Sequence, residues 1–288
     1  MIGIEIARRN YLLYLLLPHR TKMMLLTEDS RRKLDGINRE TNEAIYSGEA
    51  ATSYDRAHRY GEAEQHEFPT RILVGETWAA EGYGRALEVG AGTGYFTALI
   101  ARRARSVLAL EPAPDMQKML RARCEAEGLT NVDVMGASVE ALSSRASPAS
   151  FDSALLIHSL HHLHRRPELF DTLGRVVRPG GRLLMVEPHH NLRRAARLLR
   201  HYLKTYRARA FWTDERNWGT HDFITRGEIR ALCRRGGFDQ VRIRGHWFPY
   251  ARRMVADPVA RFRVETALAR VPGLRHFAAV LAVEARRR

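Results

Sequence analysis

The chain has 288 residues, 45% of them hydrophobic, which suffices for one large α/β domain with additions or for two small domains. Its 47 lysines and arginines against 32 acidic residues give a net charge of +15. The base composition of the source genome accounts for most of the arginines, and the alternative is an anionic partner. The two cysteines, Cys124 and Cys233, have no metal or redox spacing, so we expect small core residues in a cytoplasmic protein.

An apolar run, residues 11–18, follows Arg8 and Arg9 near the N-terminus. This order is typical of a signal peptide, but the run is far shorter than the ~20 residues that span a bilayer, and no small-residue cleavage site follows it. We interpret it as an amphipathic or buried helix, with membrane-surface contact as the alternative. Residues 28–60 have a polar helical pattern, and residues 64–81 are predicted to form the helix that leads into the first strand.

A glycine-rich turn is the first chemical signal. The apolar run Ala86–Val89, interrupted only by Glu88, has the pattern of a buried parallel strand, and Gly90, Gly92 and Gly94 follow it directly. Strand, glycine turn and helix form the nucleotide-binding unit of an open α/β sheet, because glycine permits positive φ and lets the backbone approach a ligand. A tight turn in any α/β domain would show the same glycines, so the turn alone is weak evidence.

The second strand, Val107–Leu110, ends in Glu111. A carboxylate at this place can accept hydrogen bonds from both ribose hydroxyls of a bound nucleoside. Further strands are predicted at residues 132–135, 151–157, 183–186, 238–244 and 277–284, and helices at residues 115–127, 191–210, 226–235 and 257–270.

Five short segments form a recognisable set: Leu87–Gly94, Leu110–Pro112, Phe151–Asp152, Leu160–Leu163 and Arg175–Gly181. In this order and spacing they resemble the class I S-adenosylmethionine-dependent methyltransferases of the small-molecule type, over about residues 50–288. The resemblance implies an α/β fold, a doubly wound Rossmann-like sheet of seven strands with the last one antiparallel. It also implies S-adenosylmethionine as the cofactor and S-adenosylhomocysteine as the product. A nicotinamide enzyme would more usually have its third glycine one place later.

The resemblance further implies a helical N-terminal lid, residues 1–60, on a methyltransferase domain, residues 61–288, with a helical lid insertion at 189–222. The residues implied in cofactor binding are Tyr54, Glu88, Gly90, Ala91, Gly92, Gly94, Phe96, Glu111, Pro112, Met116, Ser138, Val139, Ile157 and His158. Glu111 would hold the ribose, and Glu88 would face the methionine end through water. Ser138 stands where the family commonly has an aspartate for the adenine amino group, and it is a weaker, neutral acceptor. Tyr54 would lie over the cofactor or pack as an ordinary helix aromatic.

Four histidines crowd the end of the strand 151–157: His158, His161, His162 and His164. We predict no metal site, because no carboxylate or cysteine accompanies them at ligand spacing. His158 comes where a parallel sheet exposes its carboxyl edge, so it is the candidate nearest the methyl group. The candidate catalytic bases for a hydroxyl or amine acceptor are His158, His189 and His221, with His190 as a further option.

Residues 191–210 have the pattern of a basic helix. Its basic residues at positions 193, 197, 200, 204 and 207 share one face, and the apolar or aromatic residues at 195, 199, 202 and 206 share another. A solvated face of a lid helix is the favoured interpretation. A membrane-surface helix and a clamp for an anionic substrate are the alternatives.

We predict an enzyme that transfers a methyl group to oxygen or nitrogen of a small, largely apolar or aromatic acceptor by in-line displacement. The aromatic surface for burying a ring would come from Tyr46, Tyr54, Trp212, Trp218 and Trp247. The net charge keeps a methyltransferase for RNA or another polyanion open, although the arginines are spread along the chain, which disfavours nucleic acid. A non-catalytic cofactor-binding scaffold is less favoured still, because the glycines and both carboxylates are intact.

Overall fold

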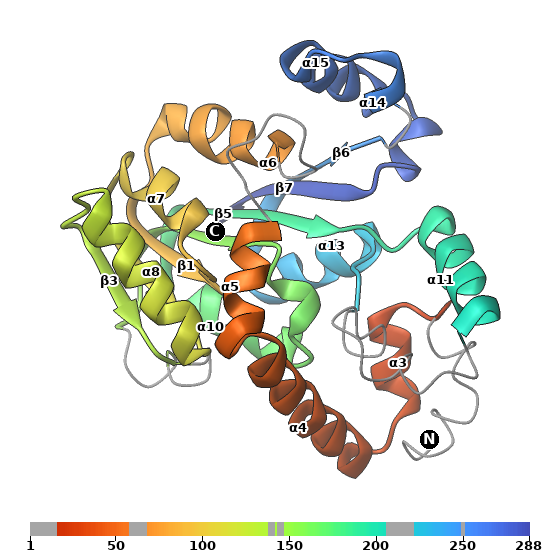
Figure 1. Cartoon of the computed structure of the whole chain (residues 1–288), viewed down its shortest axis with the longest axis horizontal. Coiled ribbons are helices and arrows are strands. Elements are labelled where there is room, and N and C mark those ends of the chain that lie inside the picture. The colour runs from red at the N-terminus through yellow and green to blue at the C-terminus, as the bar shows by residue number, and fades with distance from the viewer. Residues whose placement is uncertain (1–15, 58–67, 138–141, 143–146, 206–221, 249–250) are drawn as a thin grey trace.

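The chain forms one twisted sheet of seven strands with helices on both faces (Figure 1). The computed structural model describes residues 16–57, 68–137, 142, 147–205, 222–248 and 251–288. The strand order is β3-β2-β1-β4-β5-β7-β6, and β7 runs antiparallel to both of its neighbours while the other pairs are parallel. The predicted fold class, a doubly wound seven-stranded sheet with the last strand antiparallel, is confirmed.

The strands are β1 (Gly84–Val89), β2 (Ala104–Leu110), β3 (Val132–Met135), β4 (Phe151–Ile157), β5 (Val177–Pro188), β6 (Phe238–His246) and β7 (Val280–Arg287). β5 differs most from its expected span, because it begins before the proline-glycine-glycine turn, and β7 lies three residues later than expected. That turn lies inside the strand as an irregularity in its pairing with β4, where Phe151 pairs with Val177 but Ser153 pairs with Arg182.

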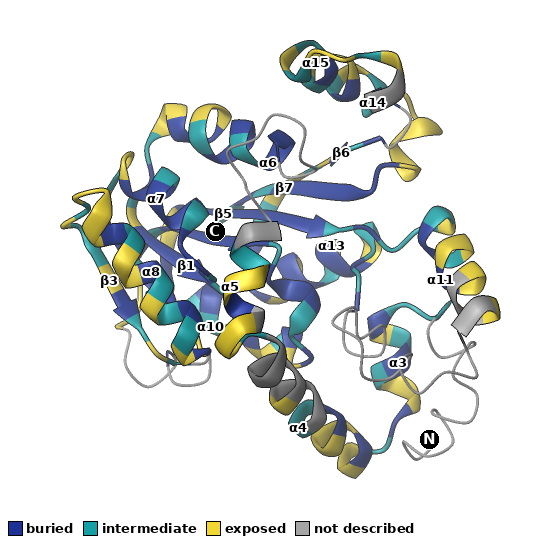
Figure 2. Ribbon diagram, viewed as in Figure 1, coloured by how far each residue is buried: buried dark blue, intermediate teal, exposed yellow. Residues whose placement is uncertain are grey.

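Apolar side chains form a layer on each face of the sheet, as the continuous apolar runs of its central strands predict. Figure 2 shows the central strands mostly in the colour of buried residues. One layer joins the strands to α10 (Arg166–Val176) and α13 (Arg226–Arg235), and it includes Leu87, Leu156, Phe170, Ile229 and Cys233. The other joins them to α7 (Tyr95–Ala101) and α8 (Pro114–Ala126), and it includes Leu155, Leu184, Ile100, Leu120 and Cys124. The sheet is therefore buried on both faces, and its carboxyl edge is left to carry a site.

The helix expected over residues 64–81 is interrupted. Its described part consists of α6 (Phe68–Ile72), a π-helical turn η1 (Leu73–Thr77) and a 3-10 turn η2 (Ala79–Glu81). The Trp78 N–H donates to the Leu73 carbonyl (2.8 Å), five residues back, where a regular α-helix would use the carbonyl four residues back. Trp78 is buried in the core directly beyond this wider turn.

Helices from distant parts of the chain lie at the carboxyl edge of the parallel strands: α3 (His19–Leu25), α5 (Gly48–Ala57) and α11 (Leu192–Thr205), with α4 (Glu28–Ile45) between α3 and α5 (Figure 1). The Gly48 N–H donates to the Asp115 carboxylate at the start of α8 (2.8 Å). His19 Nδ1 lies 2.8 Å from Asp222 Oδ2. The division into lid, domain and lid insertion stays a prediction, because residues 1–15, 58–67 and 206–221 lie outside the described part.

Substitution by alanine should destabilise the fold to different extents at Gly92 and Gly94, two glycines of the turn after β1. Both have positive φ, which costs an alanine about 1–2 kcal/mol. A Cβ on Gly94 would also stand 2.4 Å from Leu120 Cδ1, whereas a Cβ on Gly92 would meet nothing within 4 Å. We expect Gly94→Ala to lower the free energy of unfolding by an additional ~1–3 kcal/mol through overpacking. Urea denaturation of the two variants measures this difference, and equal losses would contradict it.

Candidate functional site

The turn after β1 brings the backbone to the carboxyl edge of the sheet. Gly90, Gly92 and Gly94 have φ of +75°, +57° and +84°. A Cβ on Gly90 would come within 2.6 Å of Ser159 Cβ, so this glycine allows the turn to pack on the loop after β4. Gly92 has no such neighbour and faces open space. The middle of the turn is therefore the place where a ligand can approach the backbone.

Most backbone N–H groups of the turn donate hydrogen bonds to oxygen atoms of the protein itself. Gly90 and Ala91 both donate to the Leu110 carbonyl (2.9 Å each), and Gly94 donates to the Ala91 carbonyl (3.1 Å). Gly92 donates to Glu111 Oε2 (2.8 Å). A turn that cradles phosphates must aim its N–H groups at the ligand, and these four are aimed at protein oxygens. The turn does not fit a pyrophosphate.

Glu111 follows β2 directly, and the residue is 7% exposed. Oε1 accepts from the Ala113 N–H (2.9 Å) and Oε2 from the Gly92 N–H (2.8 Å). Burial raises the pKa of Glu111, and the two N–H bonds act against that rise. Each oxygen can accept more than one hydrogen bond, so the carboxylate can still take a pair of neighbouring hydroxyls. The remaining acceptor capacity of Glu111 fits the two neighbouring hydroxyls of a ribose.

Glu88 is the second carboxyl group of this edge, one residue before the end of β1. It is 2% exposed, and the Thr97 hydroxyl donates to its Oε2 (2.6 Å). Burial raises the pKa of Glu88 to about 8, the Thr97 hydrogen bond lowers it, and the charge of Glu111 raises it. A cation bound nearby would stabilise the ionised form of both groups. The edge therefore fits a positively charged, hydroxyl-bearing nucleoside better than an anionic one.

The α5 helix covers the β2 side of this edge. Ala51 packs with Ala113 and Met116, and Tyr46 and Tyr54 lie against the same cluster. The rings of Tyr46 and Tyr54 meet edge to face, with centroids 5.4 Å apart. The structure thus brings Tyr54 and Met116 to the end of β2 where Glu111 lies.

His158 stands at the end of β4 with a φ of +54°, which is strained for a residue with a side chain. Its Nε2 lies 3.2 Å from Thr70 Oγ1, and its ring centroid lies 6.4 Å from that of Phe96. Its side chain is half-buried, and Ile157 before it is buried. His158 therefore lies at the open edge, between α6 and the helix that follows the glycine turn.

Sequence reasoning assigned no role to Glu187, which the structure places at the centre of the loop after β4. Its fully buried carboxylate accepts from the N–H groups of Ser159 (2.9 Å) and Leu160 (2.7 Å), and it lies 2.9 Å from His161 Nδ1. Burial raises the pKa of Glu187 to about 7, while the charge of His158 and the N–H bonds lower it. Glu187 thereby fixes the loop that begins at His158. The available signal was an acidic residue directly after the apolar run of the fifth strand, residues 183–186.

Comparisons with known proteins agree with this geometry. A family model described as a methyltransferase domain matches residues 87–185. A ubiquinone biosynthesis O-methyltransferase from Paracidovorax citrulli is 26% identical over 215 residues, which covers 71% of this chain and 87% of the relative. A demethylmenaquinone methyltransferase from Tropheryma whipplei is 32% identical over 123 residues, 41% of this chain and 47% of the relative.

The chain is a class I S-adenosylmethionine-dependent methyltransferase. Its fold is similar to that of Haemonchus contortus phosphoethanolamine N-methyltransferase 2, solved with S-adenosylhomocysteine, at a TM-score of 0.60 and 14% identity over 87% of this chain and 60% of the other. The YcgJ protein of Bacillus subtilis has a TM-score of 0.52 and 15% identity over 77% of this chain and 99% of its own. The predicted family and cofactor are confirmed.

Three other histidines of the methyltransferase, His162, His189 and His190, have protein partners. His189 is 4% exposed, its Nδ1 lies 3.1 Å from the Ala278 carbonyl oxygen, and burial lowers its pKa to about 4. His190 Nε2 lies 3.0 Å from the Leu16 carbonyl, and His162 Nε2 lies 3.3 Å from the Tyr46 hydroxyl. Among the described residues, no group of three or more histidine, cysteine or acidic side chains could hold a metal. The predicted Ser138, Val139 and His221 lie outside the described residues.

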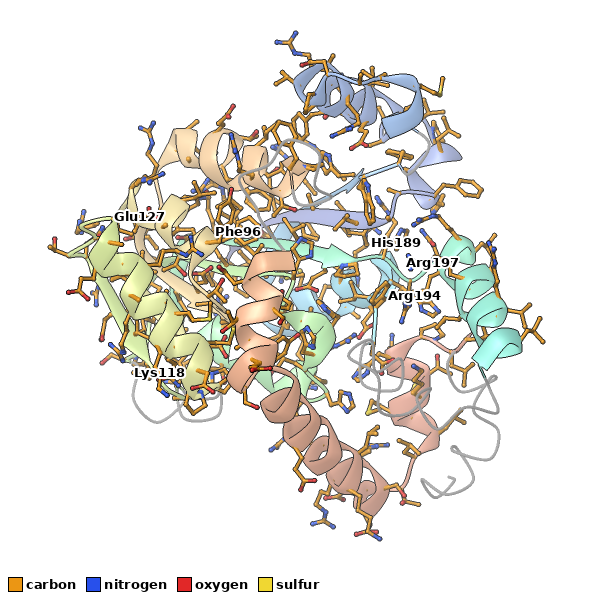
Figure 3. All side chains as sticks on the ribbon, viewed as in Figure 1. Phe96, Lys118, Glu127, His189, Arg194 and Arg197 are labelled. Carbon is orange, nitrogen blue, oxygen red and sulfur yellow. The ribbon has the colours of Figure 1, made fainter. Side chains whose placement is uncertain are left out.

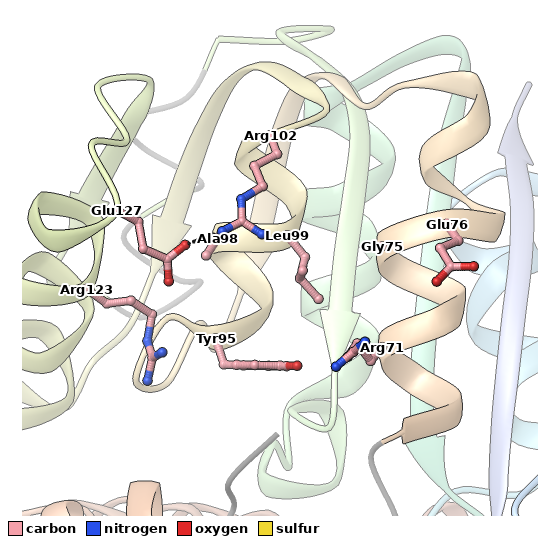
Figure 4. A pocket seen from close by; sticks show the side chains of 9 residues that line it. All are labelled: Arg71, Gly75, Glu76, Tyr95, Ala98, Leu99, Arg102, Arg123 and Glu127. Carbon is pink, nitrogen blue, oxygen red and sulfur yellow. Dashed lines mark hydrogen bonds and ion pairs between the residues drawn. The ribbon is translucent and has the colours of Figure 1, made fainter. Parts of the chain in front are cut away.

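A separate hollow of about 390 Å³ lies between α6 with η1, α7 and α8 (Figure 4). Its lining residues are Arg71, Gly75, Glu76, Tyr95, Ala98, Leu99, Arg102, Arg123 and Glu127. Arg102 forms an ion pair with Glu127 (2.8 Å), and Arg123 forms one with Asp55 (3.0 Å). The hollow includes none of the turn glycines and neither Glu88 nor Glu111, so it is not the cofactor site that the carboxyl edge offers.

The raised pKa of Glu88 predicts a pH-dependent stability. The folded protein keeps Glu88 protonated up to about pH 8, whereas the unfolded chain releases that proton near the ordinary value of 4.5. Between these values the folded state binds the extra proton, so the contribution of Glu88 to stability falls as the pH rises. Glu88→Gln removes this titration. We expect the melting temperature of the variant, relative to wild type, to rise between pH 5 and pH 8.

The measurement is thermal unfolding of both proteins across this range, followed by circular dichroism. Glu187 titrates in the same window in both proteins, so only the difference between them reports on Glu88. Two curves that stay parallel from pH 5 to pH 8 would show that Glu88 is ionised in the folded protein.

Proposed function

We propose that the enzyme transfers the methyl group of S-adenosylmethionine to a hydroxyl oxygen on the ring of a small, largely apolar aromatic acceptor. The observation that carries this proposal is the edge itself: two buried carboxyl groups, Glu88 and Glu111, flank a glycine turn whose N–H groups are already used. Such an edge suits a cationic nucleoside and leaves the β4 side free for the acceptor. The names of the relatives, ubiquinone biosynthesis O-methyltransferase and demethylmenaquinone methyltransferase, support a quinone-type acceptor.

Each predicted cofactor residue has a proposed task at this edge. Glu111 accepts from the ribose hydroxyls, and the open face of Gly92, with Gly90, Ala91 and Gly94, lets the nucleoside approach the backbone. Glu88 stabilises the positive charge of the methionine end through water. Pro112, Met116 and Tyr54 are proposed to contact the adenine base. The same role is proposed for Ser138 and Val139, which lie outside the described residues. Phe96, Ile157 and His158 face the methyl side.

S-adenosylmethionine supplies an already activated methyl group, so the protein mainly has to position the acceptor and exclude water. Positioning of this kind contributes up to ~7–11 kcal/mol to lowering a barrier. A ring hydroxyl must also lose its proton, and His158 is the proposed base. It is half-buried at the open edge, and the buried Glu187 carboxylate stabilises a positive charge on it. His189 is a poorer base, because its ring is buried against the Ala278 carbonyl.

The ribose contact can be tested with Glu111→Ala. Loss of charge-assisted hydrogen bonds to two hydroxyls should cost about 1.5–3 kcal/mol, a rise of about 10- to 150-fold in the Kd of S-adenosylhomocysteine measured by calorimetry. Glu125→Ala is the matched control, because it removes the same charge from an exposed position on α8. Unchanged affinity in a folded Glu111→Ala protein would remove Glu111 from the site.

The acceptor class can be tested with methyl-labelled S-adenosylmethionine and three separate pools: hydroxylated aromatic compounds, small amines, and mixed RNA. We expect label in the first pool, as an aryl methyl ether. His158→Gln should lower kcat by about 10²–10⁴-fold, the range of general base catalysis, with little change in the Kd of S-adenosylhomocysteine. Incorporation into RNA, with binding that falls steeply as salt rises, would favour the polyanion alternative instead.

A further inference from the structure

The α11 helix carries an apolar stripe on its exposed side. Leu192 is 78% exposed, Leu199 42% and Leu203 65%, and Ala196 between them is also exposed. At about 100° per residue these four positions fall within ~60° of one another around the helix axis. The stripe is therefore a continuous line of apolar side chains turned away from the sheet, which is unusual for the surface of a water-soluble fold.

A basic band runs beside this stripe. Arg193, Arg197 and Arg200 lie about 80–140° around the axis from Leu192, directly next to the apolar positions. Arg197 and Arg200 are exposed, and Arg193 lies over the Trp247 ring (5.8 Å). Figure 3 shows Arg194 and Arg197 on α11, close to His189 at the end of β5. The helix contains no acidic residue from Leu192 to Thr205.

The buried side of α11 is held by a different set of residues. Arg194 is 8% exposed and lies 3.3 Å from the centroid of the Phe223 ring, and Leu198 is 1% exposed. Because these residues fix the helix against the molecule, the stripe and the basic band have to face outward. We call Leu192, Ala196, Leu199, Leu203, Arg197 and Arg200 the α11 surface.

A neighbouring segment extends the exposed apolar area. The Asn191 side-chain amide donates to the carbonyls of His276 and Ala278 (2.9 Å each), which ties the start of α11 to η4 (Leu274–His276). Leu274 is 42% exposed and Phe277 is 50% exposed. Figure 2 shows exposed residues along both α11 and this segment.

We propose that the α11 surface docks on an anionic phospholipid bilayer, with the helix lying in the interface. An interfacial helix combines an apolar stripe with a basic face in this way. No helix in the described part of the chain is long and apolar enough to cross a membrane, so contact is peripheral. A second copy of the chain fits less well, since it would bring two basic bands together, and nucleic acid would leave the leucines without apolar contact.

The placement of this surface also has a functional consequence. α11 begins three residues after His189, the residue that follows β5 at the carboxyl edge, so the bilayer would lie next to the proposed acceptor side. This consequence rests on the proposed function, because a quinone-type acceptor with an apolar tail would be reached from the interface. Membrane docking itself does not depend on the identity of the acceptor.

The test is co-sedimentation with vesicles of phosphatidylcholine alone and of phosphatidylcholine mixed with phosphatidylglycerol, at low and high salt. We expect binding to the anionic vesicles that weakens as salt rises. Arg197→Gln/Arg200→Gln should weaken it about 20- to 30-fold, because each basic residue near an anionic surface contributes about 1 kcal/mol. Leu192→Gln/Leu203→Gln should weaken it about tenfold or more, through lost apolar burial.

The matched control is Arg103→Gln/Arg105→Gln, which makes the same change in net charge at exposed positions beside the amino end of β2. Affinity for S-adenosylhomocysteine and the melting temperature verify that each variant is folded. Equal binding to neutral and anionic vesicles, or an equal loss in the control pair, would overturn the proposal. So would a dimer of the wild-type chain that dissociates in the leucine variant, since that result would assign the surface to a second copy. Vesicle binding and methyl transfer are measured separately, so either can fail without the other.

Discussion

Three buried carboxyl groups organise the carboxyl edge of the sheet, and the site depends on them. Glu88 accepts from a helix hydroxyl, Glu111 from the turn after β1, and Glu187 from the loop after β4. Burial raises the pKa of each, which shows that the fold carries an electrostatic cost here. The backbone N–H groups that donate to Glu111 and Glu187, and the Thr97 hydroxyl that donates to Glu88, offset part of that cost. The same hydrogen bonds hold the loops that line the edge in one arrangement.

The same contacts decide which ligand the edge can accept. An anionic dinucleotide needs unoccupied N–H groups, and the Gly90, Ala91, Gly92 and Gly94 N–H groups are directed at protein oxygens. A cationic nucleoside needs carboxylates and open space, which Glu88, Glu111 and the Cβ-free side of Gly92 provide. A protein of net charge +15 thus places buried carboxyl groups at its cofactor site, while the exposed arginines of α11 lie beyond the end of β5.

The sequence predicts most of the frame, because the frame rests on local patterns. The apolar runs predict the strands, the alternating glycines predict the turn, and the acidic end of the second strand points to Glu111. Glu187 could not be assigned a role in this way, because its partners lie in the loop after β4. Neither segment alone predicts that β4 pairs with β5. The outward side of α11 could not be predicted either. Periodicity separates arginines from leucines, but only the contacts of Arg194 and Leu198 show which side packs against the molecule.

The central claim is that the two acidic residues and the glycine turn form one nucleoside site at the carboxyl edge. The most direct measurement is a crystal structure of the full chain with S-adenosylhomocysteine. The account predicts both ribose hydroxyls within hydrogen-bond distance of Glu111, the ribose over Gly92, and the sulfur on the side of Phe96 and His158. A nucleoside bound elsewhere, for example in the hollow lined by Arg71 and Glu76, with Glu111 still holding only its two N–H groups, would contradict it.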